Sequence, residues 1–171
     1  MKRATWVLMA TIALAGCSGA GEEPASDQKD VFVAFAADFK GFRSWQAFDV
    51  TEDADLVGIH DGSTVMEYVN AMPPAGSESF PVGTIIVKEA TVGTLAHEMF
   101  AMVKRGGGYN SGAPGWEWFE LESTGAEDVV IVWRGVGPPS GENYGGDPNA
   151  GCNTCHVDCG NDAVCAKALA L

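Results

Sequence analysis

Positive charge is scarce in this chain. Its 171 residues include 10 Lys and Arg against 23 Asp and Glu, so the formal net charge is −13 at pH 7. A protein with this balance has little basic surface for the phosphates of nucleic acid or for anionic lipid headgroups. The composition therefore argues against both as partners. It allows a neutral or cationic small molecule, or a basic redox partner protein.

Long apolar runs are missing too, apart from one near the start. Lys2 and Arg3 precede "WVLMATIALA", which is too short to anchor the chain across a bilayer. The next residues, "LAGC", follow the pattern of a bacterial lipobox ending at Cys17. We expect a signal peptide over residues 1–16, then a lipidated cysteine and flexible linker over residues 17–29. The alternative is an ordinary signal peptide that contains a cysteine.

With lipidation, the mature protein is an exported bacterial lipoprotein, anchored to the cell envelope and facing the periplasm. Its contact with the membrane is then through the acyl chains alone. That compartment is oxidising, which bears on the state of the remaining cysteines.

Internal repeats and coiled-coil heptads are absent, and residues 30–171 have the length of one domain. Phenylalanines at helical spacing predict a helix over residues 31–48. "DAVCAKALAL" predicts a short C-terminal helix over residues 162–171. Between them, β-branched or alternating segments bounded by Gly and Pro predict strands over residues 63–70, 83–90, 98–105, 116–123 and 128–136. The expected fold class is α+β, with a predominantly antiparallel sheet of about five strands.

Four of the five cysteines lie close together near the C-terminus. Cys152-Asn-Thr-Cys155-His156 is the C-x-x-C-H signature of c-type haem attachment. This spacing lets two thiols add to the vinyl groups on one porphyrin edge while the following imidazole ligates the iron. The sequence therefore predicts one covalently bound haem c, attached at Cys152 and Cys155, with His156 as the iron ligand.

Two alternatives use the same residues. Cys152, Cys155 and His156 with one further cysteine could bind zinc in a tetrahedron, or all four cysteines could form two disulfides. An oxidising compartment weakens the zinc alternative. With haem at the motif, Cys159 and Cys165 remain as a pair around a short turn, and we expect a disulfide between them.

A second strong axial ligand is missing after the motif, since neither Met nor His follows His156. A sixth ligand must come from upstream, where His60 is the leading candidate. Without one, the iron keeps an open position that binds or transforms a small ligand. With one, the protein is a simple electron-transfer lipoprotein.

Several stretches together resemble one family. "FRSWQAF", "EYVN", "FPVGTIIVKEA", "GWEWFELE" and a late "CNTCH", in this order, are similar to the cytochrome P460 / cytochrome c′-β family over residues 42–171. The resemblance implies one five-coordinate, covalently attached haem on an antiparallel sheet. It also implies an activity: oxidation of hydroxylamine, as in the P460 branch, or non-enzymatic binding of a diatomic gas such as nitric oxide. A homodimer is left open.

The resemblance also implies roles for particular residues. Lys88 in "IIVKEA" falls in the motif whose lysine is cross-linked to haem in the P460 branch. The plain alternative is a solvent-facing lysine on an alternating strand. Asp147, a few positions before the haem cysteines, is the expected general base, with Glu142 as second choice. Asp147 also reads as a turn former before Pro148.

One position departs from the family. The P460 branch tends to carry an arginine at the start of the strand over residues 63–70, where this chain has Val65, Met66 and Glu67. The departure weakens the expectation of hydroxylamine chemistry more than that of the fold. Aromatic residues that could wall the pocket, or simply form core, are Phe80, Trp116 and Trp118.

Overall fold

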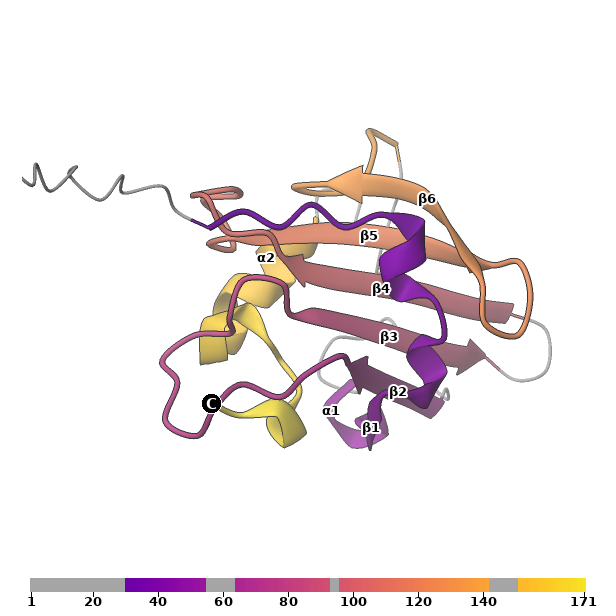
Figure 1. Ribbon diagram of the computed structural model, residues 1–171, viewed down its shortest axis with the longest axis horizontal. Helices are drawn as coiled ribbons and strands as arrows, with labels where there is room; N and C mark the ends of the chain where they lie inside the picture. Colours follow the sequence, from indigo (N-terminus) through magenta and orange to yellow (C-terminus); the bar gives the residue numbers. More distant parts are fainter. Residues whose placement is uncertain (1–29, 55–63, 93–95, 142–150) are drawn as a thin grey trace, which may run out of the picture.

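An antiparallel sheet of six strands, joined in the order β1-β2-β3-β4-β5-β6, organises the chain (Figure 1). The computed structural model describes residues 30–54, 64–92, 96–141 and 151–171. The strands are β1 (Gln46–Asp49), β2 (Thr64–Val69), β3 (Ile85–Val92), β4 (Ala96–Lys104), β5 (Trp116–Ser123) and β6 (Val129–Gly135). The mixed α+β class with a mostly β, antiparallel architecture is confirmed. The expected count of about five missed β1.

The predicted N-terminal helix is wrong. Its residues instead form two short 3₁₀ turns, η1 (Ala36–Phe39) and η2 (Phe42–Ser44), followed by β1. Gly41 separates the turns with a left-handed φ of 67°. Phe39 ends the first turn and Phe42 begins the second, and both are buried in the same core. The phenylalanine spacing therefore reflects burial on one face of the sheet and not a continuous helix.

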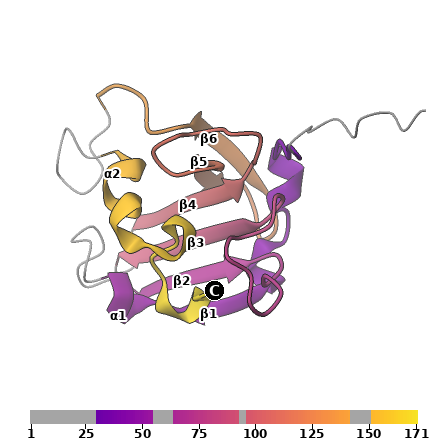
Figure 2. The same ribbon diagram turned by 90° about the vertical axis from the view of Figure 1, so that its left-hand side faces the viewer.

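The two faces of the sheet are covered by the two ends of the described chain. The N-terminal segment packs against one face, where the Phe39 and Phe119 ring centroids are 5.3 Å apart (Figure 1). The C-terminal segment, residues 151–171, lies over the other face (Figure 2). We call these the N-terminal face and the C-terminal face. The helices of the described ranges are all too short to cross a membrane.

Strand alternation assigns side chains to these faces. In β3, Ile85 and Val87 belong to the core of the N-terminal face, and Ile86 and Ala90 to that of the C-terminal face. Lys88 lies between Ile86 and Ala90 in this alternation, so its side chain is on the C-terminal face.

The predicted C-terminal helix is also wrong. The segment contains α2 (Cys152–His156) and the 3₁₀ turns η4 (Val157–Cys159), η5 (Asn161–Ala163) and η6 (Lys167–Leu169). Three consecutive residues, Asn161, Asp162 and Ala163, have φ values of 42°, 54° and 67°. An α-helix of L-residues cannot continue through this left-handed backbone. The alanines that suggested a helix instead lie in extended backbone or isolated turns.

A buried carboxylate fastens the N-terminal segment to the sheet. Glu117 of β5 is 2% exposed and accepts hydrogen bonds from Arg134 at 2.7 and 2.8 Å and from Arg105 at 3.1 Å. Arg134 also donates to the Ala34 carbonyl at 2.5 Å. The two guanidinium groups compensate the buried charge and link β5, β6 and the N-terminal segment.

We expect Glu117→Ala to lower the free energy of unfolding by about 3 kcal/mol, because two arginines lose their buried partner. Glu122→Ala is the matched control, since Glu122 lies on the same strand and is exposed. It should change stability by less than ~0.5 kcal/mol. Urea denaturation measures both. Equal effects of the two substitutions would contradict a structural role for Glu117.

Candidate functional site

The short helix α2 presents the C-x-x-C-H motif beside the C-terminal face. Cys152 and Cys155 are three residues apart, so their side chains lie on the same side of the helix. In the described part of the chain both are free thiols, and Cys152 packs against the core of the C-terminal face. The two thiols and the His156 imidazole are therefore available together.

Asn153, the first variable residue of the motif, fixes α2 to the sheet. Its Oδ1 accepts hydrogen bonds from Trp118 Nε1 at 2.7 Å and from Asn110 Nδ2 at 2.9 Å. Its Nδ2 donates to Asn110 Oδ1 at 2.8 Å. A Cβ atom at Gly112 would lie 2.6 Å from Asn153 Nδ2, so only glycine leaves room there. No sequence pattern indicates this contact, because it joins residues that are far apart in the chain.

His156 has the protonation and orientation of a metal ligand. Its Nδ1 lies 2.8 Å from the Ala163 carbonyl, so Nδ1 carries the proton and Nε2 carries the lone pair. Burial lowers the pKa of His156 to about 4, which keeps the imidazole neutral. The ring packs on Trp118, with centroids 4.5 Å apart. Trp118, one of the three aromatic residues considered as pocket walls, thus contacts the motif at both His156 and Asn153.

Phe80 and Trp116 lie in the core and contact the turn that follows α2. Both are fully buried in the core of the C-terminal face, with ring centroids 5.7 Å apart. Each also bonds to Asp162: the Phe80 amide donates to its carboxylate at 2.8 Å and Trp116 Nε1 to its carbonyl at 2.6 Å. They support the turn that holds the Ala163 carbonyl rather than lining a ligand pocket.

This turn is strained. Left-handed backbone at non-glycine residues costs roughly 1 kcal/mol or more for each residue. A salt bridge offsets part of this conformational cost, because Lys104 Nζ lies 2.7 Å from both carboxylate oxygens of Asp162. A disulfide between Cys159 and Cys165 closes the same turn.

The disulfide bears on the zinc alternative. Because Cys159 is bonded to Cys165, neither sulfur is available as the fourth ligand beside Cys152, Cys155 and His156. Burial raises the pKa of the Cys152 thiol to about 11.

Lys88 faces the motif rather than solvent. Burial lowers the pKa of Lys88, and electrostatic interaction with Glu67 and with the motif cysteines opposes this shift. The amine is thus on the same face as Cys152, which packs against the core of the C-terminal face. Its Nζ also lies 5.8 Å from the centroid of the Phe100 ring. The structure thus brings together Lys88, Cys152, Cys155 and His156, all of which the sequence had singled out.

The sequence analysis named Glu67 only as part of a departure from the family, but in the structure it lies next to Lys88. It pairs directly with Lys88 across β2 and β3, on the C-terminal face. Burial raises the pKa of Glu67 to about 7, although Lys88 acts in the opposite direction. Among the described residues, no group donates a hydrogen bond to its Oε2. A buried carboxyl group with an unused acceptor and a pKa near neutrality is suited to taking a proton from a ligand.

Other predicted residues lie outside the described residues. These are the lipidation site Cys17, the possible sixth ligand His60, and the two candidate bases Glu142 and Asp147. Their expected roles stay predictions.

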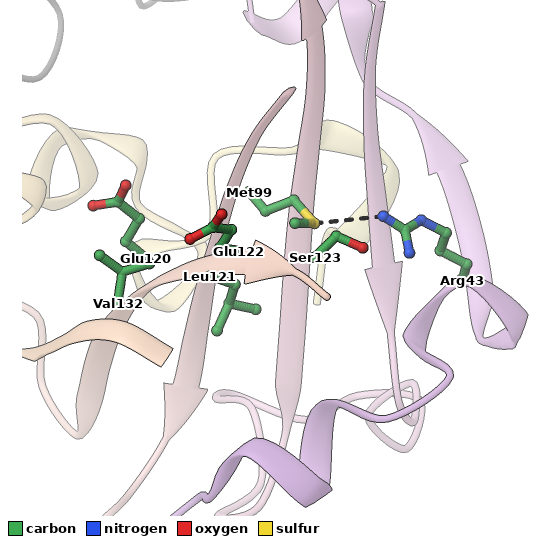
Figure 3. A pocket seen from close by; sticks show the side chains of 7 residues that line it. All are labelled: Arg43, Met99, Glu120, Leu121, Glu122, Ser123 and Val132. Atoms are coloured by element: carbon green, nitrogen blue, oxygen red, sulfur yellow. Dashed lines mark hydrogen bonds between the residues drawn. The ribbon is translucent and has the colours of Figure 1, made fainter. Parts of the chain in front are cut away.

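A separate cavity of about 540 Å³ does not involve the motif (Figure 3). Its lining residues are Arg43, Met99, Glu120, Leu121, Glu122, Ser123 and Val132. Arg43 is already engaged there by Glu89 at 2.7 Å and Met99 Sδ at 3.5 Å. The chemistry-bearing residues are thus elsewhere, around α2.

No family model matches the chain, and neither a curated protein nor a solved structure is detectably similar to it. The functional argument therefore depends on the residues around α2.

The raised pKa of Glu67 predicts a pH dependence of stability. Between about pH 5 and 7 the folded protein keeps the Glu67 proton, whereas the unfolded chain, with a pKa of 4.5, has lost it. The unfolded state binds fewer protons, so stability falls as pH rises through this range, by roughly 2 to 3 kcal/mol from this group. Urea denaturation at several pH values should show this fall reduced in Glu67→Gln and unchanged in Glu122→Gln. A fall of the same size in Glu67→Gln would contradict the assignment.

Proposed function

We propose that this protein is a mono-haem c-type cytochrome of the P460 type, exported as a lipoprotein and anchored to the cell envelope through Cys17. The observation that best supports the proposal is the chemical state of the three side chains of the C-x-x-C-H motif. Two free thiols lie on one side of α2, and His156 is neutral with its Nδ1 engaged by Ala163. This leaves Nε2 as the ligand atom, as in a haem-ligating histidine.

Cys152 and Cys155 would hold the haem through thioether bonds, and His156 would bind its iron through Nε2. When bound, the haem supplies an iron that can bind a small nitrogen compound and accept electrons from it. The two thiols are free, whereas Cys159 and Cys165 are joined to each other, which supports Cys152 and Cys155 as the attachment pair. The negative net charge of the chain supports a basic protein as electron acceptor.

We favour oxidation of hydroxylamine, or a related compound with N–H groups, over simple gas binding. The supporting observation is Glu67, whose Oε2 is buried with no donor among the described residues and whose pKa is about 7. It can take a proton from a bound nitrogen compound near neutral pH. A diatomic gas such as nitric oxide carries no proton for it. Asp147 remains a second proposed base.

Lys88 is the proposed third link between protein and haem. Burial lowers its pKa, which increases the fraction of neutral, nucleophilic amine, and it is on the face of the sheet against which Cys152 packs. Joining its nitrogen to a porphyrin carbon removes two hydrogens, so the cross-link needs an oxidant such as a peroxide.

The first test is the mass of the mature protein made with an export and haem-attachment system. We expect the mass of one haem in addition to the polypeptide, and no addition in a Cys152→Ala, Cys155→Ala double variant. Cys159→Ala, Cys165→Ala is the matched control and should keep the haem. Colourless wild-type protein with two unmodified thiols would overturn the proposal.

The second test separates the enzyme from the gas-binding protein. Turnover of hydroxylamine with an artificial electron acceptor should fall at least about 100-fold in Glu67→Gln, and the exposed control Glu122→Gln should match wild type. Lys88→Leu should lose the red-shifted Soret band expected of a cross-linked haem. A wild-type protein that binds nitric oxide tightly but does not turn over hydroxylamine would favour the c′-β-like alternative.

A further inference from the structure

The carbonyl group that engages His156 is placed by a side chain outside the haem motif. Asp162 directly precedes Ala163 in the chain. Its carboxylate accepts hydrogen bonds from Lys104 Nζ at 2.7 Å and from the Phe80 amide at 2.8 Å, and its carbonyl accepts one from Trp116 Nε1 at 2.6 Å. Asp162 is thus bonded to three parts of the fold next to the atom that holds the imidazole.

Lys104, the charged partner, is itself fixed by the sheet. It ends β4, and its Nζ donates to the Pro114 carbonyl at 2.8 Å and lies 4.9 Å from the Trp116 ring centroid. Its side chain is 9% exposed and that of Asp162 is 11% exposed, so water screens the pair little. A Cβ atom at Gly115 would come within 3.3 Å of Lys104 Cε, so this glycine gives the side chain its space.

The turn cannot be expected to keep its shape without this anchor. Residues 161–163 all have left-handed backbone. Asn161 supports the turn from the other side, donating to the carbonyls of Val164 at 3.2 Å and Leu169 at 3.1 Å. These bonds stay within the C-terminal segment, whereas Asp162 is the residue of the turn that connects it to β4 and β5.

We propose that Asp162, held by Lys104, is a positioning residue that sets the strength of His156 as an axial ligand. A short Nδ1–H to carbonyl hydrogen bond makes an imidazole more basic and strengthens its bond to a metal. By fixing the Ala163 carbonyl at 2.8 Å from Nδ1, the Lys104–Asp162 pair keeps this bond strong. The inference rests on the proposed haem function and assigns a role to two residues outside the motif.

The test is the iron–histidine stretching vibration of the ferrous haem protein, measured by resonance Raman spectroscopy. Asp162→Ala should shift it to lower frequency, and the reduction potential should become more positive, because a weaker donor favours ferric iron less. Lys104→Met should give a shift in the same direction. The double variant should shift no further than the larger single one, since both substitutions act through the same carbonyl.

Asp158→Asn is the matched control. Asp158 is an exposed acid in the same segment, so its substitution removes one negative charge near His156 without touching the turn. The iron–histidine stretching frequency of Asp158→Asn should equal that of the wild-type protein. A shift in Asp158→Asn as large as in Asp162→Ala would overturn the proposal, because charge alone would then explain it.

Asp162→Asn keeps the shape of the side chain and serves if Asp162→Ala does not fold. It should give a smaller shift in the same direction. Every variant could retain its haem while the iron–histidine frequency stays unchanged in both Asp162→Asn and Lys104→Met. That result would refute the positioning role and leave the proposed function intact. Absence of haem from the wild-type protein would instead refute the proposed function.

Discussion

The ion pair between Lys104 and Asp162 is the contact on which the C-terminal segment depends. Most of this segment consists of single turns with few hydrogen bonds of their own, so its position must come from the sheet. The pair joins the end of β4 to the strained turn after α2, at 2.7 Å and with little exposure. Removing one partner would leave the other as a buried, unpaired charge, which is a costly state. The same contact that fixes the segment also places the carbonyl that orients His156.

The two faces of the sheet use charge differently. On the N-terminal face, the buried Glu117 is fully engaged by two arginines, which is a structural arrangement. On the C-terminal face, Glu67 and Lys88 are opposite each other, and burial shifts the pKa of each toward its neutral form. A carboxyl group with a pKa of about 7 next to an amine with a lowered pKa is suited to moving protons. This is the side on which α2 presents its thiols.

The sequence alone predicted what depends on local pattern, and it failed where long-range contacts decide. Five strands followed from β-branched and alternating residues, and the haem motif from its own spacing. The period of β3 could not reveal which face Lys88 takes, and nothing local indicated that Glu67 would be its cross-strand neighbour. Both predicted terminal helices failed because spacing and alanine content do not report left-handed residues such as Gly41 and Ala163.

The measurement that tests the central claim most directly is a crystal structure of the protein purified after export and haem attachment. The account predicts thioether bonds from Cys152 and Cys155 to one porphyrin edge and His156 Nε2 on the iron. It also predicts that Nδ1 stays within hydrogen-bonding distance of the Ala163 carbonyl. A Cys152–Cys155 disulfide, a zinc ion at the motif, or an imidazole turned so that Nδ1 faces the metal would contradict it.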